Sequence, residues 1–312
     1  MKTATSLPLA GGRMLPDSTE ASTLVARARV AAFVALTKPR IALMVLFTVA
    51  TGFLLGGRGG SHPTTFVLTL FGTGLVAAGA SVWNQVIERD RDALMRRTRT
   101  RPLPSGVLTP FEAAAFGTIL TVLGVATLAI AANLLAAATA LATFVLYVGV
   151  YTPSKPLTTL NTAIGAIPGA LPPVIGWAAA TGRLGIEAWA LFLIVFLWQF
   201  PHFLAIAWIH REDYARGGHR MLPLVDPDGI LTGRQSMAHA LALVPVGMLP
   251  AAIHLAGPIY FAGALVLGLI YLAETIRFRL DPTDASARRL LRASIIYLPC
   301  ILLLLLLNPL PS

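Results

Sequence analysis

The chain has 312 residues, of which 56% are hydrophobic and only 12% are charged. A water-soluble domain carries about a quarter charged residues, so this composition excludes a soluble globular fold for most of the chain. The net charge of +10 would suggest nucleic acid in a soluble protein. In a chain this apolar the basic residues serve membrane topology instead, and we expect no nucleic-acid partner. The single cysteine, Cys300, permits no intramolecular disulfide.

The first 28 residues are mixed and polar, and we expect a flexible cytoplasmic tail there, ahead of one membrane-embedded domain over residues 29–312. Long apolar runs follow, without the period-2 alternation of barrel strands. They predict an all-α, polytopic membrane bundle of about nine transmembrane helices, because helices satisfy their own backbone hydrogen bonds. The nine runs are Ala31–Leu55, Thr65–Val86, Phe111–Ala132, Leu134–Tyr151, Leu160–Ala180, Ala188–Ile209, Met237–Ala256, Ile259–Ile276 and Ala293–Leu307.

The segments between these runs alternate sharply in charge. Of the 24 basic residues, all but Arg58 and Arg183 lie in the N-terminal region and in every second loop. Basic loops stay in the cytoplasm, so we expect the N-terminus and these loops to be cytoplasmic. The Ala- and Arg-rich composition, with no clear transit peptide, favours a bacterial inner membrane over the mitochondrial inner membrane.

The second run ends in a polar segment in which Asn84, Glu88 and Asp92 follow one another at intervals of four residues. On a helix this spacing places three oxygen-bearing side chains on one face. Carboxylates four residues apart repel each other, so a cation should lie against them, and oxygen ligands of this kind suit Mg²⁺. The spacing therefore indicates a magnesium site.

A basic cluster at residues 96–101 follows this acidic face directly. Carboxylates and arginines side by side suit a metal–diphosphate, in which Mg²⁺ neutralises one side and guanidinium groups bind the other. The alternative is salt bridging in a solvated loop. Lys155, the one charge in the loop after the fourth run, is open to two interpretations: an anchor at the membrane surface, or a phosphate contact.

The sixth run carries Gln199 and His202, and the loop after it carries His210, Asp213 and His219. Polar groups at membrane depth usually face the bundle interior and often mark function. These histidines could ligate a metal, donate protons or only form hydrogen bonds, and no two of them have the spacing of a zincin.

Taken together, these segments resemble one family. Asn84-x-x-x-Glu88-Arg-Asp90-x-Asp92, with Arg97 and Arg101 behind it, resembles the first Asp-rich motif of the UbiA-type membrane prenyltransferases. Its Glu-Arg-Asp form is similar to the protoheme IX farnesyltransferase branch. The resemblance spans residues 30–305 and includes Thr37-Lys-Pro-Arg40, Tyr151-Thr-Pro-Ser-Lys155, Trp198-Gln-Phe-Pro-His202 and Asp213-Tyr…Met221-Leu-Pro.

This resemblance implies a helical bundle around an intramembrane cavity that cytoplasmic loops cap. It implies farnesyl diphosphate as the donor, a vinyl group of heme b as the acceptor, heme O as the product and Mg²⁺ as the cofactor. The lipid bilayer is the setting, and heme A synthase or the terminal oxidase assembly are candidate partners.

The resemblance also assigns roles to residues. The expected catalytic residues are Asn84, Glu88, Asp92 and Lys155. The expected diphosphate contacts are Arg97, Arg101, Lys155, Tyr151, Lys38 and Arg40. The expected heme contacts are His202, His210, Gln199 and Trp198. The expected metal ligands are Asn84, Glu88, Asp92 and Asp213, the last because related enzymes carry a second Asp-rich motif in this region.

Two other functions stay open at this point. One is an aromatic prenyltransferase of the quinone or chlorophyll type, which differs only in its acceptor. The other is a membrane transporter, which would more naturally carry its polar groups near the bilayer midplane than at one helix end.

Overall fold

The computed structural model describes residues 18–60 and 62–310. Within them the elements are helical, apart from an isolated bridge between Ala256 and Pro309, and the predicted all-α class is confirmed. The predicted tail lies mostly outside the described residues, but from Ser18 onward it is helical. The elements are α1 (Ser18–Leu36), α2 (Pro39–Gly56), η1 (Gly57–Gly59), α3 (Pro63–Leu94), α4 (Pro110–Ala131), α5 (Leu134–Val145), η2 (Leu146–Tyr151), α6 (Thr152–Ser154), α7 (Asn161–Ala170), α8 (Pro172–Thr181), α9 (Ile186–Ile209), α10 (Arg211–Arg216), α11 (Leu222–Val225), α12 (Ile230–Ala252), α13 (Pro258–Leu280) and α14 (Asp284–Leu307).

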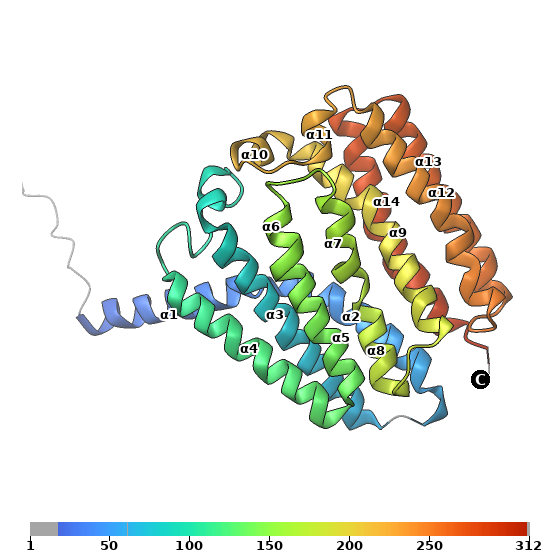
Figure 1. The fold of residues 1–312 in the computed structure, drawn as a ribbon, viewed down its shortest axis with the longest axis horizontal. Coiled ribbons are helices and arrows are strands. Elements are labelled where there is room, and N and C mark those ends of the chain that lie inside the picture. The colour runs from blue at the N-terminus through green and yellow to red at the C-terminus, as the bar shows by residue number, and fades with distance from the viewer. Residues whose placement is uncertain (1–17, 61, 311–312) are drawn as a thin grey trace, which may run out of the picture.

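In the described part of the chain, eight helical segments are long and apolar enough to cross a membrane, and they correspond to eight of the nine predicted runs. The remaining run, Met237–Ala256, is also helical, as α12. Its helix begins earlier than predicted, with polar residues such as Arg234 and Gln235 in its first turns, and it is not among the eight. α12 nevertheless packs along α13 as part of the bundle (Figure 1). Together with the eight apolar segments, it agrees with the prediction of about nine helices.

The helices form two groups that meet along α7 and α9 (Figure 1). In the first group α3 packs on α4, and α2 packs on α8. In the second group α9 packs against α12 and α14, with α13 beside both of these. The connections that carry most of the basic residues lie at one end of the bundle, at the top of Figure 1. The fold therefore gathers the candidate site residues at that end.

The first predicted run, Ala31–Leu55, is wrong at its start. α1 ends at Leu36 and α2 begins at Pro39, and Lys38 between them adopts a left-handed conformation with φ 50° and ψ 60°. Proline lacks an N–H, and its ring disfavours the helical conformation in the residue before it. One continuous helix is therefore replaced by two helices with a joint at Lys38.

Two other predicted runs continue into the site as helix. α3 extends to Leu94, well past the predicted end at Val86, so Glu88 and Asp92 lie on regular helix. α5 passes into the π-helical stretch η2, which changes the direction of the side chains that follow it. The fifth run is broken, with Leu171 between α7 and α8.

Glycines bring α2 and α8 into backbone contact. A Cβ atom at Gly176 would lie 2.0 Å from the Val49 carbonyl oxygen, and one at Gly52 would lie 2.0 Å from the Pro173 carbonyl oxygen. Small residues allow such close approach between helices in a membrane, where packing rather than hydrophobicity drives association.

We expect Gly176→Ala to destabilise the protein by about 1–3 kcal/mol, because the added methyl group would press on backbone that cannot move aside. The matched control is Gly74→Ala on α3, whose Cβ would lie 3.6 Å from the Leu46 side chain, an ordinary contact. Thermal unfolding of the purified variants in detergent measures the difference. Equal melting temperatures for the two variants would contradict this account of the interface.

Candidate active site

Three oxygen-bearing side chains line one face of the last turns of α3. Asn84, Glu88 and Asp92 are only 2%, 6% and 1% exposed, although they lie near the loop end of their helix. Each of them contacts a cation from a different segment: the α1–α2 joint, the loop after the fourth run and the loop after α3. The sequence placed these three residues on one face, and the structure confirms that arrangement.

Asn84 lies between a lysine and a threonine. Lys38 Nζ donates to Asn84 Oδ1 at 3.1 Å, and Asn84 Nδ2 donates to Thr152 Oγ1 at 3.2 Å. The joint that carries Lys38 is fastened to α3, because Gln85 Nε2 donates to the Leu36 carbonyl at 2.8 Å. The break before Pro39 therefore brings Lys38 to the site.

Glu88 pairs with Lys155, whose Nζ lies 2.7 Å from Glu88 Oε1. The same ammonium group lies 4.6 Å from the centre of the Tyr151 ring. Burial alone would lower the pKa of Lys155, but the Glu88 carboxylate holds that pKa above its ordinary value. Lys155 is therefore a buried cation that points into the site rather than an anchor at the membrane surface.

Asp92 pairs with Arg101, the last arginine of the predicted basic cluster. Arg101 Nη1 lies 2.6 Å from Asp92 Oδ2, and Thr98 Oγ1 donates to the Asp92 carbonyl at 2.8 Å. These contacts fold the loop after α3 back onto the helix end. The basic cluster thus follows the acidic face in space as well as in sequence.

The cations crowd one another, which makes the site receptive to an anion. Burial, together with repulsion from Arg101 and Lys155, lowers the pKa of Lys38 to about 7. A group whose charge is disfavoured by neighbouring cations regains it when an anion of high charge binds between them. A diphosphate has that charge.

The donor set also fits Mg²⁺. Asp92 Oδ1 is buried without a hydrogen-bond partner among the described residues, so one carboxylate oxygen is open to a cation. No group of three or more His, Cys, Asp or Glu side chains that could hold a metal ion occurs in residues 18–60 and 62–310. A metal on Asn84, Glu88 and Asp92 would therefore have few protein ligands, which Mg²⁺ tolerates because it keeps waters and takes phosphate oxygens from the substrate.

Asp213, the fourth predicted metal ligand, has other partners. It pairs with Arg216 and accepts a hydrogen bond from the Arg96 backbone N–H at 3.0 Å. The Arg216 guanidinium and the backbone donor hold the pKa of Asp213 below its ordinary value. The carboxylate joins the loop after α9 to the basic cluster, and the metal-ligand role of Asp213 stays a prediction.

Further contacts fasten the segment 210–221 to the site. Arg91 donates to the carbonyl groups of Gly217 at 3.0 Å and Gly218 at 3.1 Å. The Arg220 backbone N–H donates to the Lys155 carbonyl at 2.7 Å. Segment 210–221 is therefore attached both to the end of α3 and to the residue that pairs with Glu88.

One site residue, His219, was not assigned a role from the sequence. It is 4% exposed, and its buried Nδ1 has no hydrogen-bond partner among the described residues. Burial lowers the pKa of His219 to about 4, despite the attraction of the Glu88 carboxylate. Its imidazole is therefore neutral at pH 7. Only the tertiary fold shows that this loop histidine is buried near Glu88.

The remaining predicted diphosphate contacts differ in their positions. Tyr151 lies beneath Lys155, and the Arg97 guanidinium carbon lies 5.8 Å from the centre of the Tyr214 ring. Arg40 is exposed at the start of α2 and pairs with none of the described residues. Tyr151 and Arg97 thus border the cluster, and the diphosphate contact of Arg40 stays a prediction.

The predicted heme contacts on α9 point in two directions. Gln199 Nε2 donates to the Ala166 carbonyl on α7 at 3.2 Å. Trp198 Nε1 donates to the Ser294 carbonyl on α14 at 2.8 Å, and His202 Nδ1 lies 2.8 Å from Ser294 Oγ. The rings of Trp198 and His202 stack with centroids 4.8 Å apart. The structure therefore separates Gln199 from the other two.

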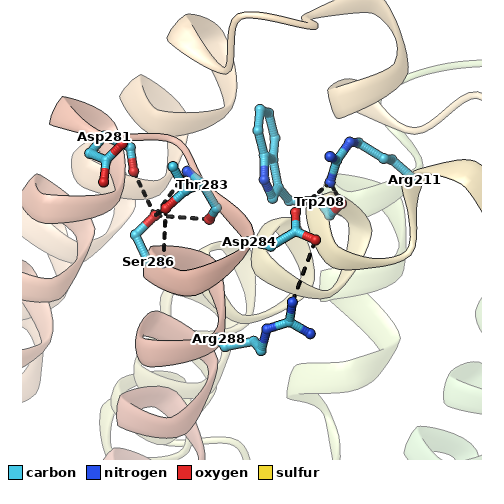
Figure 2. Close-up of polar contacts among 7 residues, drawn as sticks. All are labelled: Trp208, Arg211, Asp281, Thr283, Asp284, Ser286 and Arg288. Atoms are coloured by element: carbon cyan, nitrogen blue, oxygen red, sulfur yellow. Dashed lines mark hydrogen bonds and ion pairs between the residues drawn. The ribbon is translucent and has the colours of Figure 1, made fainter.

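His210 lies at the junction of α9 and α10, where burial and a neighbouring arginine lower its pKa. Figure 2 shows the contacts that fix this junction. Asp284 at the start of α14 pairs with Arg211 at 2.6 Å and with Arg288 at 3.6 Å, and Arg211 donates to the Trp208 carbonyl at 2.8 Å. α14 therefore holds the point from which segment 210–221 begins.

We expect Asp213→Ala to loosen segment 210–221, because it removes a carboxylate that pairs with Arg216 and accepts from the Arg96 amide. Loss of a charge-assisted hydrogen bond should raise local amide exchange about tenfold or more. Hydrogen exchange with mass spectrometry measures it. Glu212→Ala is the control, because that carboxylate is 81% exposed and its distance to Arg216 is as long as 4.0 Å. Equal exchange in both variants would show that Asp213 does not hold the segment.

Comparison with known proteins agrees with this geometry. Two curated proteins named protoheme IX farnesyltransferase are similar to the chain. The one from Solibacter usitatus is 46% identical over 285 residues, which are 88% of this chain and 98% of that protein. The one from Salinibacter ruber is 45% identical over 276 residues, with the same two shares.

Solved structures share the fold at low sequence identity. A structure described as digeranylgeranylglyceryl phosphate synthase matches with a TM-score of 0.76 and 17% identity, over 90% of this chain and 98% of that one. A UbiA homolog from Archaeoglobus fulgidus bound to GPP and Mg²⁺ matches with a TM-score of 0.62 and 18% identity, over 88% and 99%. Residues 45–306 match the UbiA prenyltransferase family. The chain is therefore a multi-pass membrane protein that belongs to the UbiA prenyltransferase family.

Proposed function

We propose that this protein transfers the farnesyl group of farnesyl diphosphate to a vinyl group of heme b, which gives heme O, with Mg²⁺ as the cofactor. The observation that carries the proposal is the buried face of α3, where Asn84, Glu88 and Asp92 each contact a cation. This arrangement supplies oxygen ligands for a metal beside positive groups for a diphosphate. The relatives named protoheme IX farnesyltransferase support heme b as the acceptor.

The cations act on the leaving group. Lys38, Lys155 and Arg101 bind the diphosphate oxygens and stabilise the charge that grows on them as the carbon–oxygen bond breaks. Each cation has one acidic or amide partner in the site, so a phosphate oxygen can compete for it. When bound by Asn84, Glu88 and Asp92, Mg²⁺ supplies further neutralisation of the diphosphate charge.

The reaction balances without an oxidant or reductant. The bond between C1 of the farnesyl group and the diphosphate oxygen breaks, and the diphosphate keeps the electron pair. The terminal carbon of the heme vinyl group bonds to the allylic cation. Water then adds to the neighbouring carbon and releases a proton. Burial of Glu88 and Asp92 limits water at the diphosphate end, which protects the allylic cation until the vinyl group reaches it.

The acceptor end lies along α9 in this proposal. His210, neutral because its pKa is lowered, is a candidate ligand for heme iron. His202 keeps only Nε2 for that purpose, because Nδ1 is engaged with Ser294. Trp198 holds α9 to α14 and Gln199 holds α9 to α7 through hydrogen bonds, and both side chains form walls of the acceptor site.

We place the protein in a bacterial inner membrane, with the basic end of the bundle in the cytoplasm. The segments rich in arginine lie at that end, together with the candidate diphosphate site (Figure 1). The diphosphate of the donor then binds at the cytoplasmic end, and the farnesyl group and the heme stay in the bilayer. Proteins that consume heme O, such as heme A synthase, are proposed partners.

We expect Glu88→Gln and Asp92→Asn to lower farnesyl transfer by about 100-fold, because each removes a charge that binds the metal. The control is Asp90→Asn on the same helix end, because the Asp90 side chain is 87% exposed. The measurement is initial rate at saturating Mg²⁺ with folding checked by thermal unfolding. Normal turnover in the Glu88 and Asp92 variants would overturn the site assignment.

The acceptor is tested by a direct choice. Purified protein with Mg²⁺ and labelled farnesyl diphosphate receives heme b in one reaction and 4-hydroxybenzoate in another. We expect label in the heme only, with the mass of a hydroxyethylfarnesyl product. Label in 4-hydroxybenzoate instead would identify an aromatic prenyltransferase of the quinone type. Label in neither compound would contradict both assignments of the acceptor.

A further inference from the structure

Thr152 is a buried residue next to the candidate site. It is 2% exposed and begins α6 directly after the π-helical stretch η2. Its hydroxyl has two contacts: Oγ1 donates to the Tyr147 carbonyl at 2.9 Å and accepts from Asn84 Nδ2 at 3.2 Å. Thr152 therefore links the end of the fourth run to the first residue of the acidic face.

The direction of these hydrogen bonds decides how the Asn84 amide is turned. A threonine hydroxyl has a single proton. Because that proton goes to the Tyr147 carbonyl, Thr152 can only accept from Asn84, and the amide must present its NH₂ group to Thr152. The Lys38 ammonium group on the other side can only donate, which requires the same orientation. Asn84 Oδ1 thus points to the side where cations bind.

The π-helical register determines which carbonyl group receives the hydroxyl proton. The Thr152 backbone N–H also donates to the Tyr147 carbonyl, five residues earlier, as π-helical register requires. In a regular α-helix that carbonyl would accept from Tyr151 instead. The wider turn places both Thr152 donors on one carbonyl and leaves the hydroxyl lone pairs facing α3. Such stretches are frequent at functional sites.

We infer that Thr152 is a positioning residue that holds the Asn84 amide with its oxygen toward the metal. This inference rests on the proposed function, because it assumes that Asn84 is a ligand. Lys38 fixes the amide from the other side, but a bound diphosphate competes for that lysine. Thr152 is then the contact that keeps the oxygen, rather than the NH₂ group, on the metal side.

The test uses the purified full chain in detergent, with Mn²⁺ as a spectroscopic probe of the metal site and an unreactive thio analogue of farnesyl diphosphate. Thr152→Val removes the hydroxyl at nearly constant shape, and Thr152→Ser keeps it. The control is Thr139→Val on α5, whose hydroxyl donates only to the Leu135 carbonyl at 2.7 Å. Electron paramagnetic resonance gives the Mn²⁺ affinity of each protein.

We expect Thr152→Val to weaken Mn²⁺ binding about tenfold or more, the usual effect of losing an outer hydrogen bond to a ligand. Thr152→Ser and Thr139→Val should bind Mn²⁺ like the unaltered protein. The Mg²⁺ concentration for half-maximal turnover should rise in Thr152→Val, and excess Mg²⁺ should restore most of the rate. Unchanged Mn²⁺ affinity in Thr152→Val, or weak binding in Thr152→Ser, would overturn the inference.

A second background separates orientation from folding. In Asn84→Asp both side-chain oxygens are equivalent, so adding Thr152→Val should no longer weaken Mn²⁺ binding. An equal loss in that background would mean that Thr152 acts through general stability, against the inference. Asp92→Asn tests the proposed function itself: if it binds Mn²⁺ normally, the metal site is wrong. If Asp92→Asn loses Mn²⁺ but Thr152→Val does not, only the role of Thr152 fails.

Discussion

Two carboxylates on one face of α3, Glu88 and Asp92, are almost completely removed from water, and a buried charge without a partner costs several kcal/mol. The surrounding chain meets this constraint with cations from other segments. Lys155 pairs with Glu88, and Arg101 pairs with Asp92. These pairs determine how the loop after α3 and the loop after the fourth run are arranged.

Irregular backbone is what allows these cations to reach the helix. Lys38 lies in a left-handed joint before Pro39, and Lys155 follows the π-helical stretch η2 and the short helix α6. Backbone of this kind is less stable than regular helix and persists where tertiary contacts hold it. Here those contacts include Gln85 to the Leu36 carbonyl and Thr152 to Asn84. The irregular segments and the charged site therefore support each other.

The second group of helices contributes a different element to the site. Segment 210–221 starts at the α9–α10 junction, which α14 holds through Asp284 and Arg211 (Figure 2). It contacts the loop after α3 through Asp213, which accepts from the Arg96 backbone N–H, and the end of α3 through the Gly217 carbonyl, which accepts from Arg91. In this way the two groups of helices meet over the acidic face.

The sequence by itself determined the membrane bundle, since long apolar runs and alternating loop charge follow from local composition. It also determined that Asn84, Glu88 and Asp92 share a face, because helical periodicity depends only on spacing. The resemblance of its motifs to a known family then supplied the chemistry. Even at this level the joint at Lys38 was missed, although Pro39 signals a helix start.

Tertiary structure alone decided which partners these residues have. Lys38 and Asn84 are 46 residues apart, and no local pattern predicts their contact. The same holds for Asp213, which contacts Arg96 from 117 residues away. His219 was a loop histidine by sequence and is a buried neighbour of Glu88 in the fold. The physical reason is that spacing along one helix fixes which way its side chains point, whereas the partners of a buried charge depend on how distant segments pack around it.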